Sequence, residues 1–162
     1  MQPTHDDGRE KFNEMLKGYK IAMLTTVHEG QLRSRPMAIQ EREFDGDLWF
    51  FTNLDGGKVC DIQDEQEVNV SYMDQGGNSF LSACGKATII RDVAKQKELW
   101  NPMVKAWFDG PEDPNLALLK VEVEGAEYWD GPHSKVLELF AIAKAALTGQ
   151  EYEAGDHAKV RL

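Results

Sequence analysis

The chain has 162 residues, enough for one domain with its own core, and its 41% hydrophobic and 9% aromatic content is typical of globular proteins. The 28 Asp and Glu residues outnumber the 18 Lys and Arg residues, so the formal net charge is −10, which disfavours binding to nucleic acid or anionic lipid. No apolar run approaches the roughly 20 residues that cross a bilayer, and the polar N-terminus lacks a secretory signal. We therefore expect a cytoplasmic protein with a single domain, residues 1–162.

The cysteines and histidines give no indication of a metal site. Cys60 and Cys84 lack metal-type spacing and are expected to be reduced, apolar side chains. The four histidines are scattered, and the chain contains no His-x-x-x-His or Cys-x-x-Cys motif. We expect no metal.

The first 19 residues are predicted to form an N-terminal helix, because apolar residues recur at helical spacing and Gly18 is a typical helix end. Residues 20–130 are rich in strand patterns joined by short turns such as Asp45-Gly46. Pro36 cannot donate a ladder hydrogen bond, so it predicts an edge strand, a bulge or backbone groups that face something else. The strands are expected at 20–27, 32–40, 48–52, 68–73, 79–90 and 116–129.

Two further helices are predicted around the last of these strands. The segment 93–108 places its apolar residues on one face, as a helix inserted into the barrel and packed on its core would. The segment 135–148 is apolar around much of its circumference, which indicates a subunit interface. Six strands with few helices predict a mainly β (α+β) antiparallel barrel with peripheral helices. A parallel nucleotide-binding sheet is disfavoured, because strands and helices do not alternate and neither common phosphate loop occurs.

The stretch WFFTNLDGGK, residues 49–58, passes from a buried strand into a turn that suits a phosphate. It supplies the Thr52 hydroxyl, the Asn53 amide, backbone amides around Gly57 and the Lys58 ammonium. A short helix expected at 58–63 would add its N-terminal amides and dipole. An ordinary surface turn with a solvated lysine also fits this stretch.

The stretch LRSRPM favours the phosphate interpretation. Arg33 and Arg35 alternate onto one strand face, where they repel each other unless an anion or a carboxylate lies between them. Glu41 or Glu43 could supply that carboxylate. If no carboxylate lies between them, these two arginines together with Arg42 and Lys58 predict a pocket for a small anion. We then expect a ligand that carries a phosphate and a flat polar ring.

Several segments together resemble one protein family. RSRPM, FFTN…GK, ELWNPMVKAWF, DPNLALLKVEVEGAEYWDGP and the closing helix are similar to pyridoxamine 5'-phosphate oxidase-like, FMN-binding split-barrel proteins, in the general stress protein 26 branch. The resemblance runs from about Lys20 to the C-terminus. It implies a six-stranded split barrel that forms a homodimer with two FMN molecules in clefts at the interface.

The resemblance also implies cofactor-binding residues. A run on the second strand would lie along the isoalloxazine, and the corner after the third strand would hold the ribityl phosphate. Trp129 would contact the flavin from the partner subunit. An arginine of the second strand, or neighbouring amides, would stabilise negative charge on the reduced ring. The implied residues are Arg33, Ser34, Arg35, Pro36, Met37, Phe51, Thr52, Asn53, Gly57, Lys58 and Trp129.

Several residues differ from those of the true oxidases, and these differences narrow the functions that we expect. Gly57 stands where they carry an arginine, Phe80 where they carry a glutamine, and Lys135 and Leu137 where they carry an Arg-x-His motif. Leucine cannot replace an imidazole, so pyridoxamine-phosphate oxidation is not expected, and no catalytic residue is assigned. Two functions stay open: an FMN-dependent oxidoreductase of an unknown small molecule with NAD(P)H as candidate donor, or a non-catalytic flavin carrier, buffer or sensor under stress. FAD in place of FMN, or haem or a deazaflavin on the same barrel, also stays open.

Overall fold

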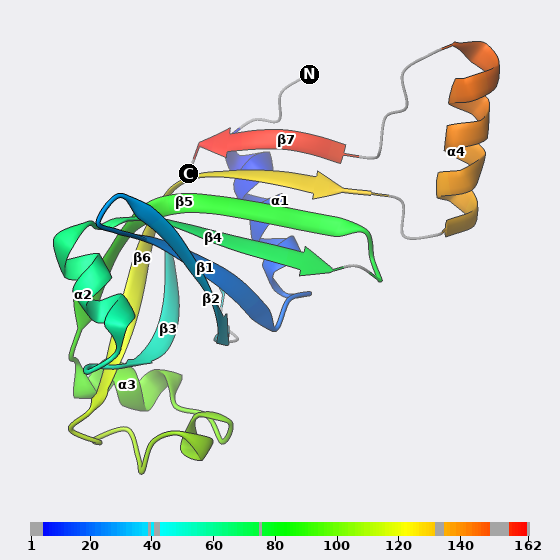
Figure 1. Ribbon diagram of the computed structural model, residues 1–162. Helices are drawn as coiled ribbons and strands as arrows, with labels where there is room; N and C mark the ends of the chain where they lie inside the picture. Colours follow the sequence, from blue (N-terminus) through cyan, green and yellow to red (C-terminus); the bar gives the residue numbers. More distant parts are fainter. Residues whose placement is uncertain are drawn as a thin grey trace.

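The computed structural model describes residues 5–38, 40, 43–74, 76–131, 135–149 and 156–161. Within these ranges an antiparallel sheet carries peripheral helices (Figure 1). The helices are α1 (His5–Leu16), α2 (Gly57–Asp64), α3 (Val93–Leu99), the 3-10 helix η1 (Val104–Ala106) and α4 (Lys135–Thr148). The strands are β1 (Ile21–His28), β2 (Gln31–Ala38), β3 (Asp47–Asn53), β4 (Glu67–Asp74), β5 (Ser79–Ile90), β6 (Leu116–Asp130) and β7 (Asp156–Arg161).

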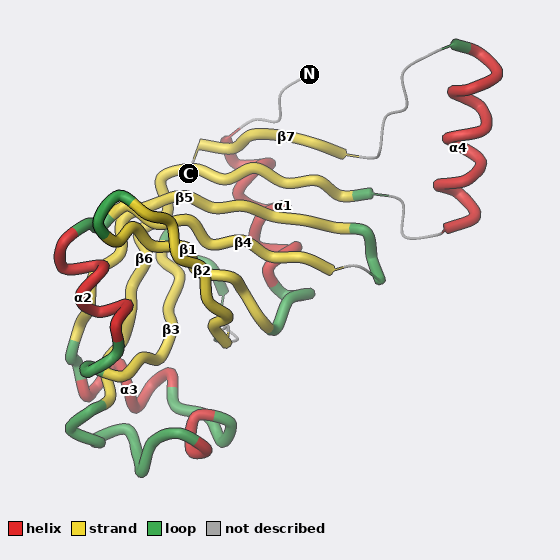
Figure 2. The backbone as a smooth tube through the Cα atoms, in the orientation of Figure 1, coloured by secondary structure: helices red, strands yellow, loops and turns green. Residues whose placement is uncertain are grey.

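The sheet order is β2-β1-β4-β5-β6-β3, and the sheet curls so that its path forms a half-barrel (Figure 2). This confirms the expected six-stranded antiparallel split barrel. β2 lies at an edge, as Pro36 predicted, and Pro36 stands opposite Met23 of β1. β7 adds a further strand that pairs with β6, from Gly125↔Arg161 to Asp130↔Asp156, and it was not predicted.

The core lies on the face of the sheet that α1 covers. Alternate residues of the strands point to this face, among them Leu24 of β1, Val70 of β4 and Leu81 of β5, and α1 contributes Phe12. Burying each such side chain contributes about 1.5–3 kcal/mol. At the irregularity between Cys84 and Gly85 the strands approach closely, and a Cβ on Gly85 would lie 2.1 Å from the Glu122 carbonyl oxygen. Only glycine fits there.

The helix predicted over 93–108 is interrupted. α3 ends at Leu99, and only η1 follows. Pro102 has no N–H and disfavours a helical conformation in Asn101. The Asn101 side chain instead donates to Gln40 Oε1 at 2.7 Å and accepts from the Met103 backbone N–H at 3.0 Å. The described helices include none that is both long and apolar enough to cross a membrane.

Candidate functional site

The corner between β3 and α2 presents the start of a helix with little cover. Gly56 is the N-cap in an extended conformation and, because it has no side chain, it forms no capping hydrogen bond. The first-turn N–H groups of a helix have no intrahelical acceptor, so they can bind an anion. A Cβ built on Gly57 would meet no heavy atom within 4 Å, so the space beside the first turn is open.

Lys58 brings a positive charge to this corner. Burial lowers its pKa, and the nearby charge of Arg35 lowers it further. Among the described residues, neither Lys58 nor Arg33 forms an ion pair with a carboxylate. Arg33 stands opposite Thr26 and Arg35 opposite Leu24, so the two arginines share a face of β2, as predicted. The corner therefore holds cationic charge that the described carboxylates do not fully compensate.

A buried polar cluster, which we call the Asp61 cluster, joins α2 to β1 and β2. It consists of Asp61, Thr26, His28 and Arg35. Asp61 Oδ2 accepts from Thr26 Oγ1 at 2.9 Å and from Arg35 Nη2 at 3.1 Å, and His28 Nδ1 lies 2.8 Å from Asp61 Oδ1. Arg35 Nη1 also donates to Thr26 Oγ1 at 2.9 Å. Asp61 is only 2% exposed, so these bonds satisfy a carboxylate that water does not reach.

The pKa of Asp61 is set by two opposing effects, burial on one side and hydrogen bonds and nearby charges on the other. Burial alone would raise it, because a low-dielectric environment disfavours the charged carboxylate. The hydrogen bonds from Thr26 and Arg35, together with the charges of His28 and Arg35, outweigh burial and hold the pKa below its ordinary value. Asp61 is therefore ionised and neutralises much of the Arg35 charge.

The carboxylate partner of Arg35 was not among those considered from the sequence. Glu41, together with Arg42, lies outside the described residues, and it is Asp61 that pairs with Arg35. Asp61 follows Lys58 by three residues, so the expected helix at 58–63 places the two side chains on neighbouring turns, but this spacing does not reveal the pairing with Arg35. Arg33 remains exposed and is the freer of the two arginines.

The remaining residues of the corner point in different directions. Thr52 is 2% exposed and faces the core, and its Oγ1 lies 3.5 Å from the Asn53 carbonyl oxygen. Phe51 packs edge-on against Trp100 with ring centroids 6.0 Å apart. Asn53 Oδ1 accepts from Asn115 Nδ2 at 3.0 Å. These side chains fix the end of β3, and the groups they leave available to a ligand are mainly backbone groups.

The β2 residues divide between the two faces of the sheet. Met37 shares the face of the arginines and is buried, opposite Ala22. Ser34 and Pro36 point to the other face, where Ser34 Oγ lies 2.6 Å from Thr25 Oγ1. A ligand along this edge strand would meet arginines on one side, small groups on the other and the backbone between them.

Trp129 lies apart from this corner in a single chain. It is near the end of β6, while α2 lies at the opposite end of the sheet (Figure 1). The indole is 38% exposed and stacks on His157, with ring centroids 5.1 Å apart and planes 8° apart. Phe80 pairs with Trp129 in register. Lys135 and Leu137 lie in α4, and their side chains fall outside the described part of the structure.

Comparison with known proteins places the chain among close structural relatives. Residues 7–153 match the family described as pyridoxamine 5'-phosphate oxidase like. General stress protein 26 of Bacillus subtilis is 29% identical over 126 residues, covering 75% of this chain and 87% of that protein. The solved structure of a Jannaschia sp. CCS1 protein assigned to general stress protein 26 is 26% identical, with a TM-score of 0.78, and covers 98% of this chain and 100% of that one. A general stress FMN/FAD binding protein from Xanthomonas citri is 35% identical, with a TM-score of 0.66, over 75% and 87% of the two chains.

Proposed function

Because the chain belongs to the pyridoxamine 5'-phosphate oxidase-like family, in its general stress protein 26 branch, we propose that it binds FMN between β2 and the start of α2. The observation that carries this proposal is Lys58, a partly buried ammonium with a lowered pKa and no carboxylate partner among the described residues. A phosphate beside it would relieve that unfavourable charge. The Xanthomonas citri relative, described as FMN/FAD binding, supports the same ligand class and keeps FAD as the variant.

The donor set of the corner fits a flavin phosphate. The Lys58 ammonium and the backbone N–H groups of Gly57 and Lys58 would hold the phosphate, and the end of β3 at Phe51, Thr52 and Asn53 would position this turn. The edge strand from Arg33 to Met37 would run along the ring. A bound flavin supplies the electron transfer, and these residues supply binding, orientation and positive charge.

A titration of the apo-protein with FMN and riboflavin, followed by flavin fluorescence, tests the proposal. The two ligands share the ring and the ribityl chain and differ only in the phosphate. We expect FMN to bind clearly more tightly, because Lys58 and the α2 amides act on the phosphate. Equal affinities would contradict the phosphate corner, and failure of both ligands to bind would contradict the flavin itself.

Gly57→Arg is expected to tighten FMN binding by about three- to tenfold, since it adds a second cation beside Lys58. The added side chain has room, because nothing lies within 4 Å of a Cβ at this position. Gly57→Ala is the matched control and should leave the FMN affinity unchanged. The titration above measures the FMN affinity of both variants. If Gly57→Arg binds FMN no more tightly than Gly57→Ala, the phosphate lies elsewhere.

We propose further that two copies form a homodimer through the outer face of the sheet, the face opposite the core. Large apolar side chains are exposed there on neighbouring strands: Leu32 at 76%, Met73 at 58%, Ile21 at 53% and Met23 at 41%. Exposed apolar surface of this extent is typical of an interface. α4, whose sequence is strongly apolar, stands away from the barrel (Figure 1), which fits a helix covered by a second copy. A partner subunit would also bring Trp129 to the flavin.

Met23→Asp is expected to convert the dimer to a monomer, because it buries a charge at the proposed interface. Size-exclusion chromatography with light scattering measures the mass. FMN affinity should fall in parallel, since the cleft would lose its second wall. Met103→Asp, at a residue that is 68% exposed outside the sheet, is the control and should stay dimeric. A monomeric wild-type protein would contradict this proposal.

The proposed activity is that of an FMN-dependent oxidoreductase of a small molecule, with NAD(P)H as donor. The alternative is a non-catalytic flavin carrier, buffer or sensor, and Leu137 favours it, because this residue stands where the oxidases carry the histidine of their Arg-x-His motif and leucine cannot replace an imidazole. Anaerobic stopped-flow mixing with NADH and NADPH separates the two. Rapid bleaching of the bound flavin supports the enzyme, and a flavin that stays oxidised with both donors supports the carrier.

A further inference from the structure

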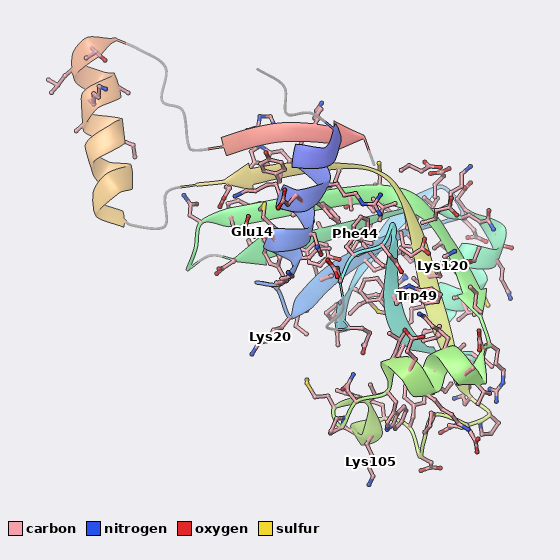
Figure 3. The ribbon with its side chains drawn as sticks, turned by 180° about the vertical axis from the view of Figure 1, so that it is seen from behind. Glu14, Lys20, Phe44, Trp49, Lys105 and Lys120 are labelled. Atoms are coloured by element: carbon pink, nitrogen blue, oxygen red, sulfur yellow. The ribbon has the colours of Figure 1, made fainter. Side chains whose placement is uncertain are left out.

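A second concavity lies on the core side of the sheet, separate from the α2 corner. It is a cavity of about 360 Å³ between α1, β3 and β4. Its walls include Leu16, Phe44, Leu48, Phe50, Tyr19 and Tyr72, so they are largely aromatic and aliphatic. Figure 3 shows Phe44 beside α1 and Trp49, which also lines the cavity, beside β3. None of the flavin-site residues proposed above lines it.

One residue that lines the cavity carries a buried polar group without a hydrogen-bond partner among the described residues. Tyr72 projects from β4 to the core face and is 3% exposed, and its hydroxyl has no hydrogen-bond partner within the described ranges. Tyr19, whose ring lies 5.3 Å from that of Tyr72, differs in this respect: its hydroxyl lies 2.9 Å from Ser79 Oγ. Burial raises the pKa of Tyr72, so the hydroxyl keeps its proton and acts as a donor. Buried polar groups without a partner are rare, and Tyr72 lines the cavity, so a ligand there could supply the acceptor that its hydroxyl lacks.

The polar groups at the rim are mostly engaged. Gln40 accepts from Asn101 at 2.7 Å, and Asp47 lies 3.3 Å from Lys120 Nζ. Lys17, also at the rim, is exposed and forms no ion pair with the described residues. The groups without a partner in the described part of the chain are therefore two buried donors of the lining residues, the Tyr72 hydroxyl and the Trp49 indole N–H, and a cation at the mouth of the cavity. These groups select a ligand that carries oxygen acceptors.

From these features we infer that the cavity is a second binding site, for a small aromatic compound with a carbonyl or carboxylate oxygen that accepts the Tyr72 hydroxyl. Its volume falls within the range of small-molecule sites, about 300–1,000 Å³. It also exceeds by far the roughly 30 Å³ that one water molecule occupies. The aromatic walls would pack on the ring, and the Tyr72 hydroxyl would fix its orientation. This inference does not depend on the flavin proposal, because the two sites share no residue.

Two fluorinated probes of nearly equal shape test the inference by ¹⁹F NMR titration. 4-Fluoroacetophenone carries the carbonyl acceptor, and 4-fluoroethylbenzene lacks it. We expect saturable binding of both probes to the wild-type protein, with the ketone bound more tightly. Tyr72→Phe removes only the hydroxyl, so it should weaken the ketone by about three- to tenfold and leave the hydrocarbon unchanged. Its thermal midpoint should not fall, because no existing hydrogen bond is lost.

A rim variant provides an independent arm of the test. Lys17→Gln should weaken 4-fluorobenzoate more than 4-fluoroacetophenone, because only the carboxylate uses the ammonium. FMN affinity should be the same in both variants and the wild type. No saturable binding of any probe to the wild-type protein would overturn the inference, as would a Tyr72→Phe variant that binds the ketone as tightly as the wild type.

Discussion

Lys58→Ala is expected to weaken FMN binding by about ten- to a hundredfold, as befits a charge-assisted hydrogen bond worth about 1.5–3 kcal/mol. The same substitution should leave riboflavin affinity unchanged, because riboflavin has no phosphate. Lys58 is singled out by its partial burial, its lowered pKa and the absence of a carboxylate partner among the described residues. Lys20→Ala, at an exposed lysine just before β1, is the control and should bind both ligands normally.

The pH dependence of FMN affinity checks the same residue. A lysine attracts phosphate only while it is protonated, so affinity should fall as pH rises through the Lys58 pKa. Because that pKa is lowered, the fall should begin at a lower pH than for an ordinary lysine. The Lys58→Ala variant should lack this alkaline loss. Equal loss of FMN and riboflavin in the variant would instead mean that Lys58 supports the fold and not the phosphate.

Asp61→Asn should destabilise the protein by about 3 kcal/mol, since removing one charge of a buried pair strands the other. Asp61 accepts bonds from Thr26 and Arg35 and contacts His28, so one carboxylate holds α2 against two strands. Asparagine keeps the shape but loses the charge and one acceptor. Urea unfolding measures the change. Asp64→Asn, at an exposed position of the same helix, is the control and should unfold as the wild type does.

The stability difference between wild type and Asp61→Asn should depend on pH. The folded-state pKa of Asp61 lies below its ordinary value, so the carboxylate contributes stability that is fully present above the unfolded pKa of about 3.9. That contribution is lost as pH falls through the folded-state pKa, and the two proteins should converge in acid. A variant as stable as the wild type at neutral pH would show that the Asp61 cluster does not hold α2 in place.

The main strands could be predicted because their signals are local. Alternating apolar residues indicate the strands, and Pro36 marks β2 as an edge strand. The hairpin predicted at Asp45-Gly46 is wrong, because β2 and β3 lie at opposite ends of the sheet order and β3 pairs with β6 instead. β7 was missed because its six residues, DHAKVR, lack an apolar alternation strong enough to indicate a strand. The helix at 93–108 was predicted too long, since its apolar stripe outweighed the effect of Pro102.

The site was predictable only in part, because some of its contacts join segments that are far apart in the sequence. The shared face of Arg33 and Arg35 follows from strand alternation, and Lys58 at a helix start follows from the turn before it. The pairing of Arg35 with Asp61 joins segments 26 residues apart, so no local pattern reveals it. The inward orientation of Thr52 depends on which face of β3 meets the core, which also requires the whole fold. The unpartnered hydroxyl of Tyr72 likewise appears only once α1 and the sheet are packed together.

A crystal structure of the protein soaked or co-crystallised with FMN tests the central claim most directly. We expect the phosphate within hydrogen-bond distance of Lys58 Nζ and the amides at the start of α2, the ring beside Arg33 to Met37, and Trp129 of a second copy nearby. A flavin bound elsewhere, or crystals grown at saturating FMN that contain no flavin, would contradict the account.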